Sequence, residues 1–146
     1  MSFKIYTDGS CTNNGYFPNE GGFGVVVVNE NDELVTTHSE RENNTTNNRQ
    51  EMKAILYALR NYGKDNPDVY TDSHYSLMTF TVWMYGWQKR GWLKADNTTP
   101  ENLDLVKEFL DLWEQGNRIN LIKVKGHSGN RWNELADSLA TNKGEK

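Results

Sequence analysis

Four acidic residues lie far apart in this sequence, in settings that do not suit a merely solvated charge: Asp8, Glu51, Asp72 and Asp137. Asp8 closes the strand-like alternation of residues 3–8, and Asp72 closes that of residues 69–72. If these strands are parallel neighbours, their carboxyl ends form the crevice in which open α/β sheets bind ligands. Carboxylates crowded there repel one another unless a cation joins them, so the pattern predicts a metal site.

The other two acids belong to segments with helical periodicity. Glu51 lies at the edge of the apolar stripe of residues 52–59, so we expect its side chain to point toward the sheet. Asp137 lies among packing positions, beyond the first turn of its helix, so the helix dipole explains neither acid. Carboxylate oxygens without a nearby cysteine or histidine pair suit a hard ion such as Mg²⁺ or Mn²⁺ and do not suit zinc.

Each acid also has an ordinary explanation when it is taken alone. Asp8 and Asp72 fit turn residues. Glu51 fits a charge at the border of the core, and Asp137 fits a solvated acid. Structural ion pairs are common where acids meet a core, so one such residue favours the ordinary explanation. Four together favour a shared functional site.

The apolar patterning predicts the elements that hold these acids. A first strand, a buried strand over residues 21–28 and an antiparallel partner over residues 34–40 form a three-stranded meander. The later elements expected are a helix capped by residues 43–48 and ending near Gly63, a strand ending at Asp72, a short helix over 73–79, a tryptophan-rich helix with a basic loop, a helix opened by residues 99–101, a strand over 119–124 and a helix over 132–141.

Composition bounds the class of protein. With 146 residues, the chain is expected to form one domain, residues 1–146. Its formal net charge of −4, taken alone, argues against a nucleic-acid partner. The distribution of charge matters more, because residues 83–94 carry Lys89, Arg90 and Lys94 and no acid.

The remaining composition bears on location. Cys11 is the only cysteine, which fits a reducing compartment and makes the cytoplasm the default expectation. The chain starts directly with a strand pattern, and its longest aliphatic run, Val25–Val28, is far too short to cross a bilayer. We therefore expect no export signal and no membrane association. The sequence leaves the oligomeric state open, with a monomer as the default expectation.

Five segments, in order along the chain, resemble type 1 ribonuclease H: Tyr6–Cys11, Thr45–Glu51, Thr71–Ser73, Val124–Gly129 and Asn133–Asp137. The similarity runs from about residue 4 to residue 141 and includes the basic segment 83–94. It implies an α/β, ribonuclease H-like fold. That fold is a five-stranded mixed sheet with helices on both sides, in which the first three strands are antiparallel and the last two are parallel to the first.

The same resemblance implies an endonuclease that hydrolyses the RNA strand of RNA–DNA hybrids and leaves 5′-phosphate and 3′-hydroxyl ends. Four of its catalytic residues would be metal ligands: Asp8, Glu51, Asp72 and Asp137. They would bind two Mg²⁺ ions, for which Mn²⁺ can substitute. Asp8 would bridge both ions, Glu51 and Asp72 would complete one shell, and Asp137 the other. Two such ions, about 4 Å apart, activate water and neutralise the departing 3′ oxygen. His127 matches the family's loop histidine, which implies a catalytic part in proton movement or product departure.

Short polar side chains suit the recognition of 2′-hydroxyls across the wide, shallow minor groove of a hybrid. The candidates are Asn14, Asn47, Asn48 and His74. Matching family positions also place Cys11 near the sugar edge and Thr46 near a DNA-strand phosphate. The alternative for residues 43–48 is a helix cap with a solvated loop, and the sequence does not separate these roles.

The tryptophans and cations of residues 83–94 predict a groove that follows the DNA backbone. Its candidate contacts are Trp83, Lys89, Arg90 and Lys94, with the cations assigned to phosphates. Tryptophans at helical spacing more often pack in a core than on a ligand surface. We therefore expect Trp83 and Trp87 to pack inward, so that only part of the cluster meets DNA.

Two positions depart from the family pattern. Residues 14–20 are bulkier than the family's short Gly/Pro turn, and His74 stands where glutamine is common. Substrate contacts are therefore expected to differ at these positions.

Three other classes of protein fit parts of the sequence. A catalytically silent binder would lack at least one metal carboxylate. A transposase- or resolvase-like nuclease would not need the Asn–Thr run or the basic segment. The long amphipathic helices disfavour a tryptophan-rich sugar-binding domain.

Overall fold

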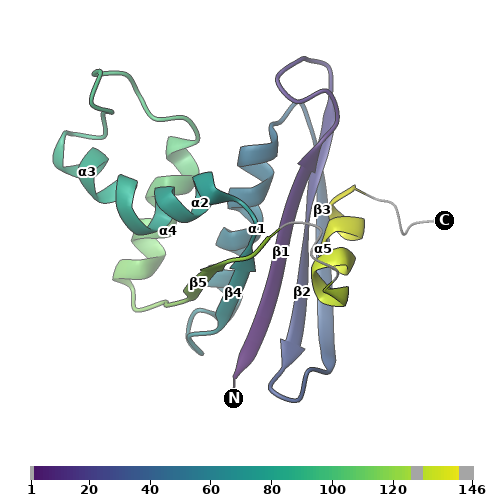
Figure 1. Cartoon of the computed structure of the whole chain (residues 1–146). Helices are drawn as coiled ribbons and strands as arrows, with labels where there is room; N and C mark the ends of the chain where they lie inside the picture. Colours follow the sequence, from purple (N-terminus) through teal and green to yellow (C-terminus); the bar gives the residue numbers. More distant parts are fainter. Residues whose placement is uncertain (1, 126–129, 142–146) are drawn as a thin grey trace.

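A five-stranded mixed sheet forms the centre of the computed structural model, which describes residues 2–125 and 130–141. The strands are β1 (Phe3–Cys11), β2 (Glu20–Asn29), β3 (Leu34–Asn43), β4 (Asp68–Thr71) and β5 (Asn120–Lys123), in the spatial order β3-β2-β1-β4-β5 (Figure 1). The first three are antiparallel neighbours, and β4 and β5 run parallel to β1. This is the fold class predicted from the sequence.

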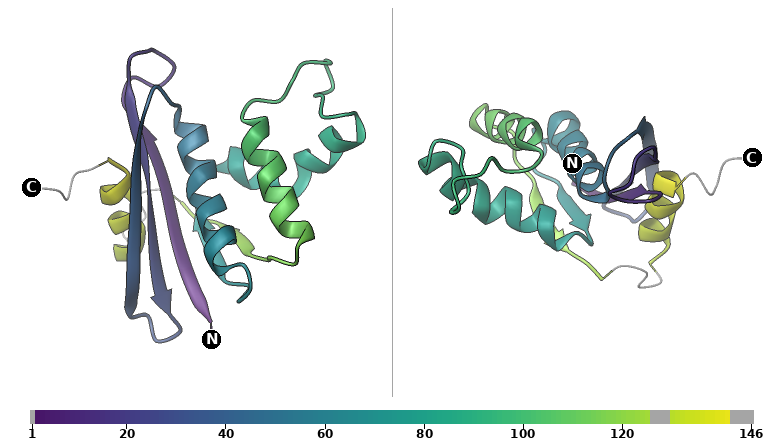
Figure 2. Two further views of the ribbon diagram at one scale, coloured as in Figure 1. Left: turned by 180° about the vertical axis from the view of Figure 1, so that it is seen from behind. Right: turned by 90° about the horizontal axis from the view of Figure 1, so that it is seen from above.

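Helices cover both faces of the sheet. They are α1 (Asn47–Tyr62), α2 (His74–Met78), the π-helical segment η1 (Thr79–Trp83), α3 (Met84–Lys89), α4 (Leu103–Glu114) and α5 (Arg131–Thr141). α5 packs on the opposite face from α1, and α2, α3 and α4 lie on the α1 side (Figure 2). In the described ranges, none of the helices is both long and apolar enough to cross a membrane.

The two faces of β2 explain its continuous apolar run. Val25 and Val27 belong to the core beneath α1, whereas Val26 and Val28 belong to the core beneath α5. Successive side chains of a strand point to opposite faces, so a strand covered on both faces needs apolar residues at every position. The centre of the sheet therefore lies between α1, which carries Glu51, and α5, which carries Asp137.

Several boundaries differ from the sequence prediction; β3, for example, continues to Asn43 instead of ending at residue 40. β1 continues to Cys11 instead of ending at Asp8, because β2 pairs with it as far as Cys11↔Gly21. α4 begins at Leu103, not within residues 99–101, because Asn102 adopts a left-handed conformation with φ 59° that interrupts the helix. The strand predicted to end at Asp72 ends one residue earlier, at Thr71, so Asp72 directly follows β4.

Candidate metal centre

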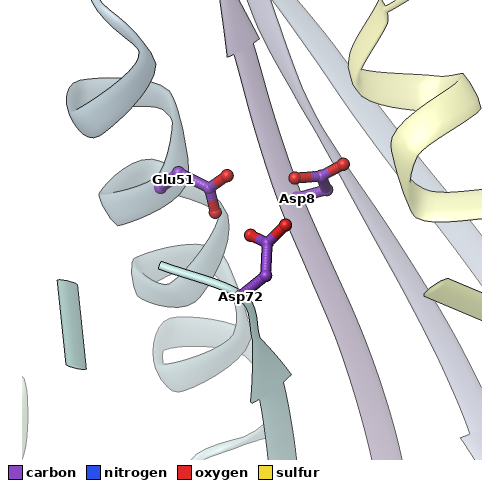
Figure 3. Close-up of side chains that lie close together, drawn as sticks. All are labelled: Asp8, Glu51 and Asp72. Carbon is purple, nitrogen blue, oxygen red and sulfur yellow. The ribbon is translucent and has the colours of Figure 1, made fainter. Parts of the chain in front are cut away.

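Three carboxylates from distant parts of the chain converge at one point of the structure. Asp8 lies on β1, Glu51 on α1 and Asp72 directly after β4, and their side chains point toward one another (Figure 3). Each offers one oxygen within 4.8 Å of the oxygens of the other two. Such a group of oxygens is suited to a cation and, without one, is costly because like charges are crowded in a partly buried place.

The pairing of β1 with β4 sets the level of two of these acids. Their parallel ladder ends at Tyr6↔Tyr70, so Asp8 and Asp72 both lie two residues beyond its last pair. The Thr7 hydroxyl donates a hydrogen bond of 2.8 Å to the Tyr70 carbonyl and ties the strands together just before they separate. Although β1 does not end at Asp8, this acid still lies at the carboxyl end of the parallel pair, where α/β sheets bind ligands.

Two glycines let the helices approach the sheet closely. A Cβ atom on Gly9 would lie 2.3 Å from the Glu51 nitrogen, and one on Gly24 would lie 2.4 Å from the Ala136 carbonyl oxygen. Both contacts are with backbone, so neither could be relieved by turning a side chain. Because Gly9 has no side chain, α1 can bring Glu51 close to Asp8. Because Gly24 has none, α5, which carries Asp137, can pack directly against β2.

Asp137 faces the same open cleft, of about 510 Å³. The cleft is lined by Asp8, Gly9, Ser10, Cys11, Asn47, Asn48, Glu51, Asp72, Ser73, His74, Tyr75 and Asp137. Asp137 also lines a small adjoining cavity with Asp8 and Asp72. The structure therefore brings all four predicted carboxylates to one cleft, three of them within mutual ligand distance.

Burial raises the pKa values of Asp8 and Glu51. It raises the pKa of Asp8 to about 7, with further upward contributions from the charges of Asp72 and Asp137, while a hydrogen bond with Glu51 opposes the change. Burial, followed by repulsion from Asp8 and Asp72, also raises the pKa of Glu51 well above its ordinary value. Both acids are therefore easier to ionise when positive charge is brought into the cleft.

The donor set fits a hard divalent cation. Within residues 2–125 and 130–141, Glu51 Oε2 is a buried oxygen without a hydrogen-bond partner. Buried polar atoms are nearly always paired, and an ion is one of the partners that explain an exception. Mg²⁺ and Mn²⁺ prefer carboxylate oxygens. The residues present therefore suit such an ion.

The raised pKa of Asp8 predicts how the chelator-treated protein responds to pH. Because this pKa is about 7 in the folded state against 3.8 ordinarily, the protonated carboxyl favours folding, and its contribution is lost as pH rises from about 4 to about 7. We expect a loss on the order of 1–3 kcal/mol from this group. Urea unfolding between pH 5 and 8 with chelator measures it, and saturating Mg²⁺ should remove most of it. A metal-free protein that gained stability over this interval would contradict the assignment.

Four predicted substrate contacts border the cleft with the acids: Cys11, Asn47, Asn48 and His74. The Cys11 thiol donates to the Thr45 carbonyl at 3.4 Å, so its sulfur is held against the start of α1. His74 opens α2 and is exposed. These side chains come from three elements, and together they form the polar border that groove recognition requires.

The remaining two polar candidates have structural partners. The Thr46 hydroxyl accepts a hydrogen bond from the Arg49 nitrogen and caps α1, as the helix-cap alternative expects. Asn14 Oδ1 accepts a hydrogen bond of 2.9 Å from the Asn47 nitrogen. Both residues therefore organise the first turn of α1, which lies at the border of the cleft.

The tryptophan-rich segment forms a second groove, of about 350 Å³. It is lined by Tyr75, Trp83, Trp87, Lys94 and Glu101. The expectation that Trp83 packs inward is wrong, because its side chain remains 36% exposed, whereas Trp87 packs against the core. The π-helical turn η1 ends at Trp83, so this side chain points in a different direction from the one that a continuous α-helix would give it. Lys89 and Arg90 are exposed on the surface outside this lining.

Several lining residues were not predicted. Tyr75 borders both the acidic cleft and the tryptophan groove, and its ring lies edge-on to Trp83 with centroids 5.8 Å apart. Ser10 and Ser73 also line the cleft, two residues after Asp8 and one residue after Asp72. Glu101 places an acid in a groove that the sequence suggested to be free of acids. His127 lies outside the described residues.

Comparisons with known proteins place the chain among relatives of one kind. The RNase H family model matches residues 1–145. A ribonuclease H from Caldanaerobacter subterraneus subsp. tengcongensis is 43% identical over 140 residues, which cover 94% of this chain and 88% of that protein.

Solved structures agree on the fold. LC9-RNase H1, described as a type 1 RNase H with the type 2 active-site motif, is similar with a TM-score of 0.80 and 31% identity, over 97% of this chain and 71% of that one. The foamy viral protease-reverse transcriptase in complex with RNA/DNA hybrid is similar with a TM-score of 0.82 and 20% identity, over 96% of this chain and 19% of that one. The second likeness concerns the fold alone.

Proposed function

This chain belongs to the ribonuclease H family, and from that membership we propose that it is an endonuclease that hydrolyses the RNA strand of RNA–DNA hybrids, leaving 5′-phosphate and 3′-hydroxyl ends. The observation that carries the proposal is the group of carboxylates, Asp8, Glu51 and Asp72, within 4.8 Å of one another in an open polar cleft. A catalytically silent binder would have no need to maintain such repulsion.

The carboxylates are proposed to hold two Mg²⁺ ions, with Mn²⁺ as a substitute. Asp8 has neighbours on both sides, since it groups with Glu51 and Asp72 and shares a small cavity with Asp137. It is therefore the residue proposed to contact both ions. When bound, such ions supply a water nucleophile at neutral pH and stabilise charge that develops on the phosphate. Glu51, held by α1 against Gly9, fixes one side of this arrangement.

The polar border of the cleft is proposed to recognise the sugar edges of the hybrid. Asn47, Asn48 and Cys11 present amide and thiol groups beside the carboxylates, and His74 faces them from the start of α2. Amides both donate and accept hydrogen bonds, as a 2′-hydroxyl does. Asn14 and Thr46 support these contacts through their bonds to the first turn of α1. His127 is proposed to assist proton movement or product departure.

The tryptophan groove is proposed to hold the DNA strand. Tyr75 joins it to the acidic cleft, which gives a duplex one continuous surface. Lys94 and Trp83 line this groove, and the exposed Lys89 and Arg90 are proposed to reach phosphates beside it. The monomeric state and the cytoplasmic location stay predictions.

Removing the exposed cations should weaken binding in a salt-dependent manner. For Lys89→Ala combined with Arg90→Ala, we expect the slope of log Kd against log salt concentration to flatten by roughly one unit for each lost phosphate contact. Fluorescence anisotropy with a labelled hybrid in Ca²⁺ or chelator measures the slope. Lys64→Ala, at an exposed lysine just beyond α1, is the matched control and should keep the wild-type slope. Equal slopes for all three proteins would refute the phosphate assignment.

One substrate comparison tests the proposed function. Labelled RNA–DNA hybrid, duplex DNA and duplex RNA are incubated with the protein in Mg²⁺, Mn²⁺ or chelator, and product ends are mapped by electrophoresis. We expect cleavage of RNA in the hybrid alone, only with metal. Cleavage of duplex DNA would favour the transposase- or resolvase-like alternative, and binding of the hybrid without cleavage would favour the silent binder.

A further inference from the structure

We propose that Tyr16 and Phe17, at the tip of the β1–β2 hairpin, form an aromatic contact that packs against the sugar and base edges of the hybrid next to the cleft. This inference rests on the proposed function and adds a specificity-determining pair to it. It concerns residues 12–19, which connect the two strands.

The two rings are unusually open to solvent. Tyr16 is 77% and Phe17 is 65% exposed, which are the highest values among the large hydrophobic side chains of the described residues. A single exposed apolar residue is ordinary on a protein surface. Two adjacent rings that contribute nothing to the core indicate a surface that another molecule covers.

The loop that carries the rings is held firmly. Asn19, 9% exposed, donates to the Thr45 carbonyl at 3.1 Å and accepts from the Thr45 nitrogen at 2.9 Å. The Asn44 nitrogen donates to the Asn19 carbonyl, and the Tyr16 nitrogen donates to the Asn13 carbonyl at 2.8 Å. Groups that are already ordered lose less entropy on binding, so a fixed loop presents its rings at low cost.

The same loop is joined to the border of the cleft. Cys11, immediately before it, lines the cleft, and Asn14 accepts a hydrogen bond from the nitrogen of Asn47, another lining residue. Figure 1 shows the hairpin tip beyond the arrowhead of β1, near the N-terminal end of α1 and on the side of the sheet toward which β1 and β4 both point. A duplex lying over the carboxylates therefore has the aromatic tip at its side.

The chemistry of the loop favours the groove of a duplex over its phosphates. Residues 12–19 carry no charge, in a chain with a net charge of −4. Apolar side chains enter minor grooves, and in RNA helices of the A form the minor groove is wide and shallow and displays the sugar and base edges. The neighbouring asparagines supply the hydrogen bonds that such a groove requires. A second copy of this chain or a protein partner would be the competing occupant.

The test compares Tyr16→Ala combined with Phe17→Ala against the wild type in hybrid cleavage and binding. We expect KM and Kd to rise by at least roughly 5-fold with kcat nearly unchanged, because the apolar area that two rings bury against the groove is lost while the carboxylates are untouched. The slope of log Kd against log salt should stay at the wild-type value, because no phosphate contact is lost. Phe17→Tyr, which keeps the ring, should bind as the wild type does.

A matched control uses another exposed apolar pair. Leu34 and Val35, 48% and 50% exposed, begin β3 at the opposite end of the meander from the tip. Leu34→Ala combined with Val35→Ala should leave KM unchanged. The inference is overturned if the tip variant keeps the wild-type KM and Kd. It is also overturned if only the oligomeric state changes, as measured by analytical ultracentrifugation, because a second copy of the chain would then be the occupant. In both cases cleavage by the wild type would leave the proposed function standing. A wild type inactive on every hybrid would instead defeat the proposed function.

Discussion

Replacing Asp8 by Asn should lower cleavage of the RNA strand by roughly 10³-fold or more and, at the same time, raise the thermal stability of the chelator-treated protein. The loss of activity is expected because Asp8 is the carboxylate shared by both sides of the cluster. Removal of one well-placed electrostatic group typically costs about 10²–10³ in rate, and this residue would serve two ions. Asn has nearly the same shape, so packing should be preserved.

The gain in stability has a separate cause. Burial and the neighbouring acids raise the pKa of Asp8 to about 7, so ionising it at pH 8 without metal opposes folding. A neutral amide removes this repulsion, and we expect about 1–2 kcal/mol, or a few degrees in Tm. Scanning calorimetry at pH 8 with chelator measures the gain. Adding Mg²⁺ should then stabilise the wild type far more than the variant.

The control for Asp8→Asn is Asp65→Asn, because Asp65 is exposed in the loop after α1. This change should leave both cleavage and Tm near the wild-type values. Two outcomes would count against the account of the cluster. The first is cleavage by Asp8→Asn at a rate close to the wild type, and the second is a chelator-treated variant no more stable than its parent.

Local sequence predicted what local interactions determine. The alternation before Asp8, the run Val25–Val28 and residues 69–72 indicated strands that do form, because backbone pairing follows the apolar pattern, although the last of them ends one residue before Asp72. The meeting of Asp8 and Asp72 followed from the rule for parallel strands. The ordering of the strands rested on a resemblance to a known family, since alternation alone does not say which strands are neighbours.

Other features depend on contacts between distant segments. No local pattern shows that Glu101 joins the tryptophan groove or that Tyr75 borders both clefts, because their neighbours come from elsewhere in the chain. Trp83 was misassigned for a similar reason. A helical wheel assumes 3.6 residues per turn, whereas the π-helical segment that ends at this residue has a wider turn.

The sequence predicted that Glu51 points toward the sheet, but how closely α1 approaches β1 could not be predicted, because it depends on the missing side chain at Gly9. A Cβ atom there would lie 2.3 Å from the Glu51 nitrogen and 2.5 Å from the Gln50 carbonyl carbon, both backbone atoms of α1. Helix and strand must therefore separate if any side chain is added. Gly9 therefore sets how closely α1 approaches β1, and with it the distance between the carboxylates of Glu51 and Asp8.

Gly9→Ala should consequently impair both folding and catalysis. Overpacking against backbone typically costs about 1–3 kcal/mol, which urea unfolding should detect. A displacement of Glu51 by about 1 Å should reduce kcat by up to roughly 10²-fold. The displacement should also raise the Mg²⁺ concentration needed for half-maximal cleavage, a readout that lowered stability alone would not change when the assay is run at a temperature where the variant is folded.

Gly86→Ala provides the comparison that separates the close approach from the general effect of adding a methyl group. Gly86 lies within α3, and the nearest atom to its added Cβ would be Arg90 Nη1, at an ordinary 3.5 Å. Alanine favours helices, so this variant should be more stable by about 0.5–1 kcal/mol and should keep its metal dependence. If Gly9→Ala matched it in Mg²⁺ requirement and kcat, the approach of α1 to β1 would not be what sets the geometry of the cluster.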